Sequence, residues 1–438
     1  MYIPHSEEET HRALKSLGLS SLEDLFSHID PSLFSKPELP PPKSEEELRR
    51  YVKELSDQNK RLICFAGFGA YDRIIPSALW QILSRGEFLT AYTPYQPEAS
   101  QGTLQALFEY QTLMCELTGM DVANAGMYDG GSALAEAVLM ARAIKGKGKR
   151  VVLSQGVHPF YLEVVKTYMR CYEDEVLLCP LTQGGHTDLE RLKESLEDGQ
   201  AHALAVQYPN FLGFVEPLKE ISELSQKYEV PLVVCADPIA LAILRPPGEF
   251  GAHIVVGEGQ QLGIPLSFGG PYIGFFATRM EYVRKMPGRL VGMAEDIEGK
   301  MAFTLVLQTR EQHIRRERAT SNICTNQNLM ALANLIYIVL LGREGLREVA
   351  VQSLSKAMYL KNRLMELGFE EIYKSKHLWE FPLRHKRAKE LYQKALRAGF
   401  LLGVPLESFG YEDTLLLAIT EKRTKEEMDS LIALLKTT

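Results

Sequence analysis

The sequence of 438 residues contains little cysteine and no excess of basic charge. No C-x-x-C pair occurs and no group of cysteines and histidines has zinc spacing, so we expect no bound metal. The net charge of -7 argues against a surface for nucleic acid or for an anionic membrane. Several cysteines lie in apolar runs, which is typical of small core side chains. The six are Cys64, Cys115, Cys171, Cys179, Cys235 and Cys324.

Long apolar runs are also absent. No stretch of 18 apolar residues occurs, so the sequence predicts no transmembrane helix. The N-terminal residues M-Y-I-P-H-S-E-E-E are acidic and contain no apolar h-region, so they are not typical of a signal peptide. We therefore expect a cytoplasmic protein.

The overall composition, with 45% hydrophobic and 24% charged residues, is typical of a globular protein. From about residue 60 to Ala277, short apolar runs alternate with amphipathic segments, as in buried parallel strands joined by helices. We therefore predict an α/β fold with a mostly parallel sheet covered on both faces. The predicted strands are 150–154, 175–180, 203–209, 231–237 and 253–257, and the predicted helices are 159–168, 188–199 and 216–228.

The two ends of the chain differ from this pattern and suggest three parts. Residues 1–60 form a predicted N-terminal arm, which either lies over a partner chain or makes a plain surface subdomain. Residues 61–321 form the predicted large α/β domain, and residues 322–438 a smaller α+β domain. Helix starts are predicted after Ser6, at Ser21 and after Ser44, further helices over 327–341, 346–367 and 425–436, and a strand over 414–420.

One local absence bears on chemistry, because no lysine occurs between Lys227 and Lys285. The stretch holds a buried strand ending in Asp237, then a second buried strand and a glycine-rich loop. In a Schiff-base enzyme an aspartate in the first place keeps a pyridine nitrogen protonated, and a lysine after the second strand forms the imine. Gln260 and Gln261 occupy that second place. Such a gap also arises by chance, so its meaning depends on the fold.

A glycine-rich helix start is a candidate phosphate site. Gly130, Gly131 and Ser132 follow N-A-G-M-Y-D and would present free backbone N–H groups at the positive end of the helix dipole. A helix start capped by Asp129 explains the same residues, and that carboxylate would repel a phosphate placed close by.

Polar groups also lie at the ends of several predicted strands, four of them consecutive when the glycine-rich helix start is included. His158 could stack on a cofactor ring or be a hydrogen-bonded turn histidine, Asn210 could contact a cofactor substituent, and Asp237 ends the next strand. Because the carboxyl ends of parallel strands meet at one sheet edge, we expect a ligand crevice there.

Two other segments are rich in side chains suited to recognition. T-A-Y-T-P-Y-Q-P-E-A-S-Q-G (90–102) is an aromatic, proline-rich loop before a helix. Q-T-R-E-Q-H-I-R-R-E-R-A-T-S-N-I-C-T-N-Q (308–327) concentrates arginines that could clamp carboxylates or phosphates. With Glu311 and Glu317 interleaved, a helical face of ion pairs four residues apart is the simpler interpretation. The arginines are Arg310, Arg315, Arg316 and Arg318.

Taken together, these segments resemble the glycine cleavage system P-protein family, the decarboxylating glycine dehydrogenases, which are fold type I pyridoxal-phosphate enzymes. The resemblance runs nearly end to end and is strongest in 92–102, in G-G-P-Y-I-G-F-F-A (269–277) with M-P-G-R-L-V-G (286–292), and in 309–325. Arg318 stands where the family pattern has lysine, which preserves the charge.

The resemblance implies a division of labour between two halves. The family has either one chain of about twice this length or two subunits, and its cofactor lysine lies in the second half, in a segment like N-x-H-K-T. This chain resembles the first half, the alpha-type subunit 1. The implied partners are a catalytic subunit 2, in an αβ unit that pairs into a tetramer, and the lipoylated H-protein. Glycine is the implied substrate of the complex and pyridoxal phosphate its cofactor, expected in the partner.

On this basis the crevice residues Gly130, Gly131, Ser132, His158, Asp237, Gln260 and Gln261 are expected to be remnants of a cofactor site. Catalysis by this chain alone is not expected, but it would contribute residues across the interface: Tyr92, Tyr95, Gln96, Arg315, Arg316, Thr320, Ser321 and Asn322. One alternative is a scaffold that docks the H-protein and adds nothing to the active site. Another is an independent lyase that uses a different lysine, such as Lys285.

Overall fold

The computed structural model describes residues 5–35, 37–325 and 327–436. Their contacts divide the chain into two compact units, Met1–Lys60 and Arg61–Thr438. The first unit holds α1 (Glu7–Ser16), α2 (Glu45–Asp57) and two 3-10 turns, η1 (Glu23–Phe26) and η2 (Pro31–Leu33). Ser6 and Ser44 form the predicted helix caps, while the helix predicted at Ser21 is only the turn η1.

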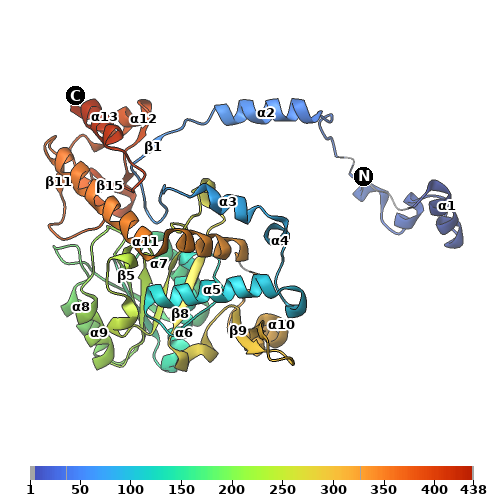
Figure 1. The fold of residues 1–438 in the computed structure, drawn as a ribbon, viewed down its shortest axis with the longest axis horizontal. Coiled ribbons are helices and arrows are strands. Elements are labelled where there is room, and N and C mark those ends of the chain that lie inside the picture. Colours follow the sequence, from blue (N-terminus) through green and yellow to red (C-terminus); the bar gives the residue numbers. More distant parts are fainter. Residues whose placement is uncertain (1–4, 36, 326, 437–438) are drawn as a thin grey trace. The chain divides into compact units, whose positions relative to one another are not determined.

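A seven-stranded, mostly parallel sheet is the centre of the second unit, which confirms the predicted α/β fold (Figure 1). The strand order is β2-β8-β7-β6-β5-β3-β4, and only β8 runs antiparallel to its neighbours. The strands are β2 (Val122–Ala123), β3 (Arg150–Ser154), β4 (Glu175–Cys179), β5 (Ala201–Tyr208), β6 (Leu232–Ala236), β7 (Ile254–Glu258) and β8 (Gly274–Thr278).

Side chains alternate between the two faces of this sheet and build two separate cores. Val152, Leu204 and Val234 face one core, with α5 (Gln101–Thr118), α8 (Leu189–Leu196), α9 (Leu218–Lys227) and α11 (Asn328–Met365). Val151, Ala205 and Cys235 face the other, with α6 (Gly130–Lys145) and α7 (Pro159–Met169). Both faces are covered, which explains why the strands are apolar throughout.

The sequence placed most of these elements within two residues. The strand predicted over 253–257 continues to Glu258, which puts a carboxylate rather than a glycine at the strand end. The two helices predicted over 327–341 and 346–367 are the single element α11, bent at Gly342, whose φ is 61°. Strand β15 (Thr414–Ala418) and helix α13 (Lys425–Lys436) lie where predicted.

A second sheet, ordered β11-β12-β15-β14, lies beside α12 (Ala388–Arg397) and α13 in the C-terminal part of this unit. Its strands are β11 (Glu370–Glu371), β12 (Glu380–Arg384), β14 (Val404–Pro405) and β15. Strand β1 (Ile63–Cys64) pairs in parallel with β13 (Phe400–Leu401), so the start of the second unit is tied to its end. The predicted three-part domain division stays a prediction.

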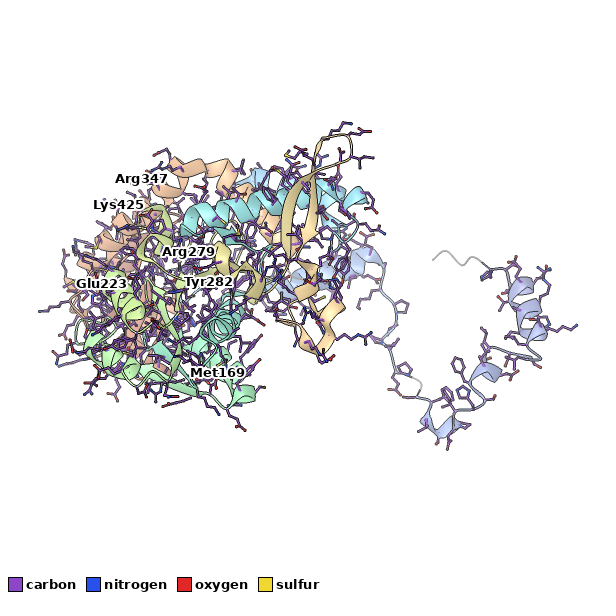
Figure 2. All side chains as sticks on the ribbon, turned by 90° about the horizontal axis from the view of Figure 1, so that it is seen from below. Met169, Glu223, Arg279, Tyr282, Arg347 and Lys425 are labelled. Carbon is purple, nitrogen blue, oxygen red and sulfur yellow. The ribbon has the colours of Figure 1, made fainter. Side chains whose placement is uncertain are left out.

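The sequence did not predict a hairpin formed by β9 (Leu290–Glu295) and β10 (Met301–Val306). It projects from the body of the unit (Figure 2), and Ile297 at its tip is fully exposed. Its base packs on α5. Exposed apolar residues interrupt the alternation in β9, so its pattern was ambiguous.

Helix α11 is long and apolar enough, by length and composition, to cross a membrane, contrary to the expectation from apolar run length. Half of its most apolar window is buried in the fold. The part from Asn328 to the bend at Gly342 spans only about 20 Å at about 1.5 Å per residue, against about 30 Å of bilayer hydrocarbon. It packs on α3 (Ser77–Leu83) and α5 as a core helix.

Replacing Leu204 with alanine is expected to lower the free energy of unfolding by about 2 to 5 kcal/mol, because this fully buried side chain fills the core between β5 and its helices. Urea denaturation of the isolated chain measures the change. Leu340→Ala, on the exposed side of α11, is the control and should stay within about 0.5 kcal/mol. Equal losses for both variants would contradict the assignment of the core.

Candidate functional site

A polar crevice lies at the carboxyl ends of β6 and β7, where the strand pattern predicted it. Asp237 directly follows β6. Its Oδ1 accepts hydrogen bonds from the backbone N–H groups of Ile239 (2.8 Å) and Ala240 (3.1 Å), and its Oδ2 accepts one from Gln261 Nε2 (2.8 Å). Burial raises the pKa of this carboxyl, and Arg73 opposes the shift.

Gln261 links that aspartate to a buried arginine. Its Oε1 accepts two hydrogen bonds from Arg73, from Nε at 2.8 Å and from the terminal nitrogen Nη2 at 2.7 Å. Arg73 also pairs with Glu421 at 2.6 Å, donates to Ser353 Oγ at 3.1 Å and lies over the ring of Trp379. Both Oε1 and Nε2 of Gln261 are therefore hydrogen-bonded, and the side chain links Arg73 to Asp237.

Gln260 has a purely internal role. Its Nε2 donates to the carbonyls of Tyr71 (3.1 Å) and Ile264 (2.7 Å), and its Oε1 accepts from the Tyr71 N–H (2.9 Å). It is buried and fixes the loop after β7 to the segment before α3.

The N-terminus of α6 is already occupied by carboxylates of the chain itself. Asp129 is the N-cap, accepting from Ser132 N–H at 2.7 Å, which confirms the capped-helix alternative. Glu258 Oε2 accepts from Gly130 N–H at 2.9 Å, and its Oε1 accepts from the N–H groups of Gln260 (3.0 Å) and Ile273 (3.2 Å). Burial raises the pKa of Glu258 to about 8. The predicted phosphate cradle is thus filled by a side chain.

The Tyr161 side chain packs against the N-terminus of α6. A Cβ on Gly130 would lie 2.6 Å from the Tyr161 hydroxyl, and one on Gly131 would lie 3.2 Å from its ring. These glycines therefore permit close packing of Tyr161 against α6.

His158 is the N-cap of α7 and lies against other aromatic rings. Its Nδ1 accepts from the Phe160 N–H (3.2 Å), and its Nε2 lies 3.2 Å from the Phe68 carbonyl. The ring centroid is 4.2 Å from that of Phe68 and 4.8 Å from that of Tyr161. Burial lowers the pKa of His158 to about 4, so the imidazole is neutral near pH 7. Phe68 thus covers a face on which a cofactor ring would stack.

Asn210 lines a neighbouring cavity of about 30 Å³ together with Tyr71 and Asp237, but its side-chain amide is hydrogen-bonded within its own turn. Its Nδ2 donates to Gly185 O and to Glu216 Oε1, both at 2.8 Å, and its Oδ1 accepts from the N–H groups of Leu212 and Phe214. The side chain satisfies its own turn after β5, because a buried amide must find partners wherever the backbone offers them.

The crevice residues do not fit pyridoxal phosphate. The cavity that remains among Tyr71, His158, Tyr161, Asp237 and Gln261 is about 40 Å³, room for one or two waters. No lysine lines it among the residues that the structure describes. Lys285 instead donates to Ala143 O (2.7 Å), at the end of η8 (Met280–Lys285). An aromatic phosphate ester would have to displace Glu258 from the N-terminus of α6.

A second polar cluster, which we call the Tyr95 cluster, lies on the surface and comprises Tyr92, Thr93, Tyr95, Arg289, Glu311, His313, Cys324 and Thr325. Tyr92 and Tyr95, from the predicted recognition loop, have 74% and 41% exposure. Thr325 Oγ1 lies 2.9 Å from Thr93 Oγ1 and donates to the Tyr92 hydroxyl at 3.3 Å. The structure therefore brings together the two segments that the sequence marked for recognition.

The arginine-rich segment does not form the predicted helical face of ion pairs. It consists of two short turns, α10 (Gln312–Arg315) and η10 (Arg316–Arg318), with a positive φ of 53° at Arg316. Arg310 is buried and donates to the carbonyls of Met286, Gly288 and Leu307. Arg310 therefore bonds to distant backbone carbonyls instead of to a glutamate four residues away, and sequence spacing cannot show such distant partners.

The other predicted interface residues have separate surroundings. Arg315 donates from Nε to Thr309 O (3.0 Å), and Arg316, Asn322 and Gln96 are exposed. Ser321 hydrogen-bonds the carboxyl of Glu136, whose pKa burial raises to about 7. Thr320 lines a separate cavity of about 300 Å³ along α6.

Sequence reasoning missed three residues that decide the two sites: Phe68, Glu258 and Arg289. Glu258 follows the predicted strand end by one residue, and only this place at the crevice edge of the sheet could have marked it as a site residue. Arg289 lies within M-P-G-R-L-V-G, one of the strings that carried the resemblance. Nothing local marks Phe68, which reaches the crevice from another part of the chain.

Comparison with known proteins gives a consistent result. The family model described as "Glycine cleavage system P-protein" matches residues 1–435. A protein of Aquifex aeolicus, "Probable glycine dehydrogenase (decarboxylating) subunit 1", is 70% identical over 99% of this chain and 100% of its own length. The protein of the same name from Carboxydothermus hydrogenoformans is 49% identical, over 99% of both chains.

Solved structures agree with the fold. A crystal structure of glycine decarboxylase (P-protein) of the glycine cleavage system, in inhibitor-bound form, has a TM-score of 0.93 and 42% identity, covering 100% of this chain and 99% of its own. The Lactobacillus brevis glutamate decarboxylase has a TM-score of 0.68 at 12% identity, covering 95% and 96% of the two chains, which shows the fold alone. These neighbours are fold type I enzymes, as predicted.

The buried Glu258 is expected to make the chain less stable as the pH rises. Its folded pKa of about 8 lies above that of the unfolded chain, so the folded state retains a proton that the unfolded state releases. The contribution is complete below about pH 4.5 and is lost as the pH rises through about 8. Glu258→Gln should therefore reduce the fall in the free energy of unfolding between about pH 5 and about pH 8.5.

Urea denaturation across this pH range measures the effect, with Glu223→Gln as the control. Glu223 is exposed on α9 and labelled in Figure 2. A Glu258→Gln variant with the same pH dependence as the native chain would contradict the protonated state of Glu258.

Proposed function

This chain belongs to the glycine cleavage system P-protein family as a subunit of glycine decarboxylase, and on this premise we propose that it has no imine-forming site of its own. The observation that carries this proposal is that Glu258 occupies the N-terminus of α6 and that Gln260 and Gln261 stand at the expected lysine position, each hydrogen-bonded within the chain. A catalytic subunit 2 would hold pyridoxal phosphate, and its electron-sink chemistry would decarboxylate glycine. This chain alone would be inactive.

In this proposal the chain completes the partner's active site through the Tyr95 cluster. Tyr92 and Tyr95 are exposed although large and partly apolar, and hydrogen bonds to two separate segments order them. Aromatic hydroxyls held in this way suit contact with a second protein surface. The reaction would end with transfer of the aminomethyl group to the lipoyl arm of the H-protein, in an α2β2 assembly.

A scaffold that docks the H-protein without contributing to the active site is the second candidate. An independent lyase is less well supported, because Lys285 is bonded to Ala143 O and lies outside the crevice. All six cysteines are free thiols, which supports the proposed cytoplasmic location.

The isolated chain is expected to form no imine with pyridoxal phosphate. Absorbance of a protonated imine and trapping by borohydride measure this, and the reconstituted complex with subunit 2 should give both signals. Peptide mapping then assigns the reduced adduct. A stoichiometric adduct on any one lysine of this chain would overturn the proposal.

Tyr95→Phe is expected to lower glycine turnover of the reconstituted complex about tenfold or more, because it removes one positioned hydroxyl at the interface. Size-exclusion chromatography verifies that the complex remains intact. Tyr228→Phe is the matched control, since its hydroxyl contacts only Glu197 on the surface. Unchanged turnover in an intact Tyr95→Phe complex would favour the scaffold.

A further inference from the structure

Arg289 is the buried centre of the Tyr95 cluster, with only 1% of its side chain exposed. One terminal nitrogen, Nη2, donates to the Tyr95 hydroxyl at 2.8 Å, and the other, Nη1, donates to the Cys324 carbonyl at 3.0 Å. The guanidinium also lies 5.1 Å from the centre of the Tyr95 ring. A single side chain therefore connects the loop before α5 to the segment before α11.

The charge of Arg289 is only partly compensated. Its Nε lies 3.8 Å from Glu311 Oε2, and that carboxylate is 5% exposed. Within the described part of the chain, neither Arg289 Nε nor Glu311 Oε1 has a hydrogen-bond partner. Such a pair contributes little to stability, because the desolvation of two charges offsets their attraction.

Lysine could not replace this arginine geometrically. The two hydrogen bonds and the stacking on Tyr95 use the planar, forked guanidinium, whereas an ammonium is a single point charge. His313 completes the arrangement, with its ring 5.4 Å from that of Tyr95 and its Nδ1 3.7 Å from Glu311 Oε2. The geometry at Arg289 therefore sets where the Tyr95 hydroxyl points.

We propose that Arg289 is a positioning residue for the glycine decarboxylase reaction, acting through the Tyr95 hydroxyl. It holds this hydroxyl at the surface in the orientation in which it meets the partner subunit's active site. This inference rests on the proposed function, because it requires the Tyr95 cluster to act across the interface. Glu311 lies beside the guanidinium, with its Oε2 3.8 Å from Arg289 Nε.

Arg289→Lys in the reconstituted complex is expected to lower kcat for glycine about tenfold to a hundredfold, because a displacement of about 1 Å is enough for such a loss. The KM for glycine should change much less, and complex formation should persist. Arg279→Lys is the matched control. Arg279, labelled in Figure 2, also donates to backbone carbonyls, of Gly248 and Ala252, and is the N-cap of η8.

A double-mutant comparison separates positioning from a purely structural role. If Arg289 acts through the Tyr95 hydroxyl, Arg289→Lys with Tyr95→Phe should lose hardly more turnover than Tyr95→Phe alone. Fully multiplied losses, or an Arg289→Lys complex with native kcat, would overturn the inference. Unchanged turnover in Tyr95→Phe alone would instead refute the proposed function, so the two failures are distinct.

Should Arg289→Lys prevent assembly, Glu311→Gln supplies the same comparison. It keeps the side-chain volume and leaves the guanidinium in place without its charged partner. A loss of kcat of about threefold or more that disappears in the Tyr95→Phe background supports positioning through Tyr95. No loss, or a loss that persists in that background, contradicts it.

Discussion

The buried chain of hydrogen bonds from Asp237 through Gln261 to Arg73 is the constraint on which the second unit depends. Asp237 ends a central strand, Arg73 precedes α3, and Glu421 follows β15, so these contacts join both sheets. Glutamine suits this place because its amide accepts from a guanidinium and donates to a carboxylate at the same time. A lysine there could only donate, which would place a second cation beside Arg73 and remove the acceptor of its Nε and Nη2.

The same principle explains why the crevice is closed. A buried helix end needs an acceptor for its free N–H groups, and Glu258 supplies it for α6. A buried histidine needs its ring faces covered, and Phe68 covers one. Glu258 thus takes the hydrogen-bonding place that a cofactor phosphate would have, and Phe68 the stacking place that a cofactor ring would have. The cavity that remains is about 40 Å³.

The chemistry of the surface is of a different kind. The Tyr95 cluster places two aromatic hydroxyls, a thiol and two threonine hydroxyls on a buried Arg289–Glu311 pair. Rigid support beneath exposed polar groups is typical of sites that must be ordered before a partner arrives. The second unit therefore combines a crevice that its own side chains largely satisfy with an ordered polar surface cluster.

The sequence by itself determined the periodic elements. The apolar runs of β3, β5 and β6 and the caps at Ser44 and Asp129 follow from local chemistry, because burial on both faces and unpaired helix N–H groups leave a local pattern. Tertiary structure alone decided how Phe68, Glu258 and Arg289 are used. Their partners lie many residues away in the chain, and no pattern of spacing records which distant groups a buried side chain will contact.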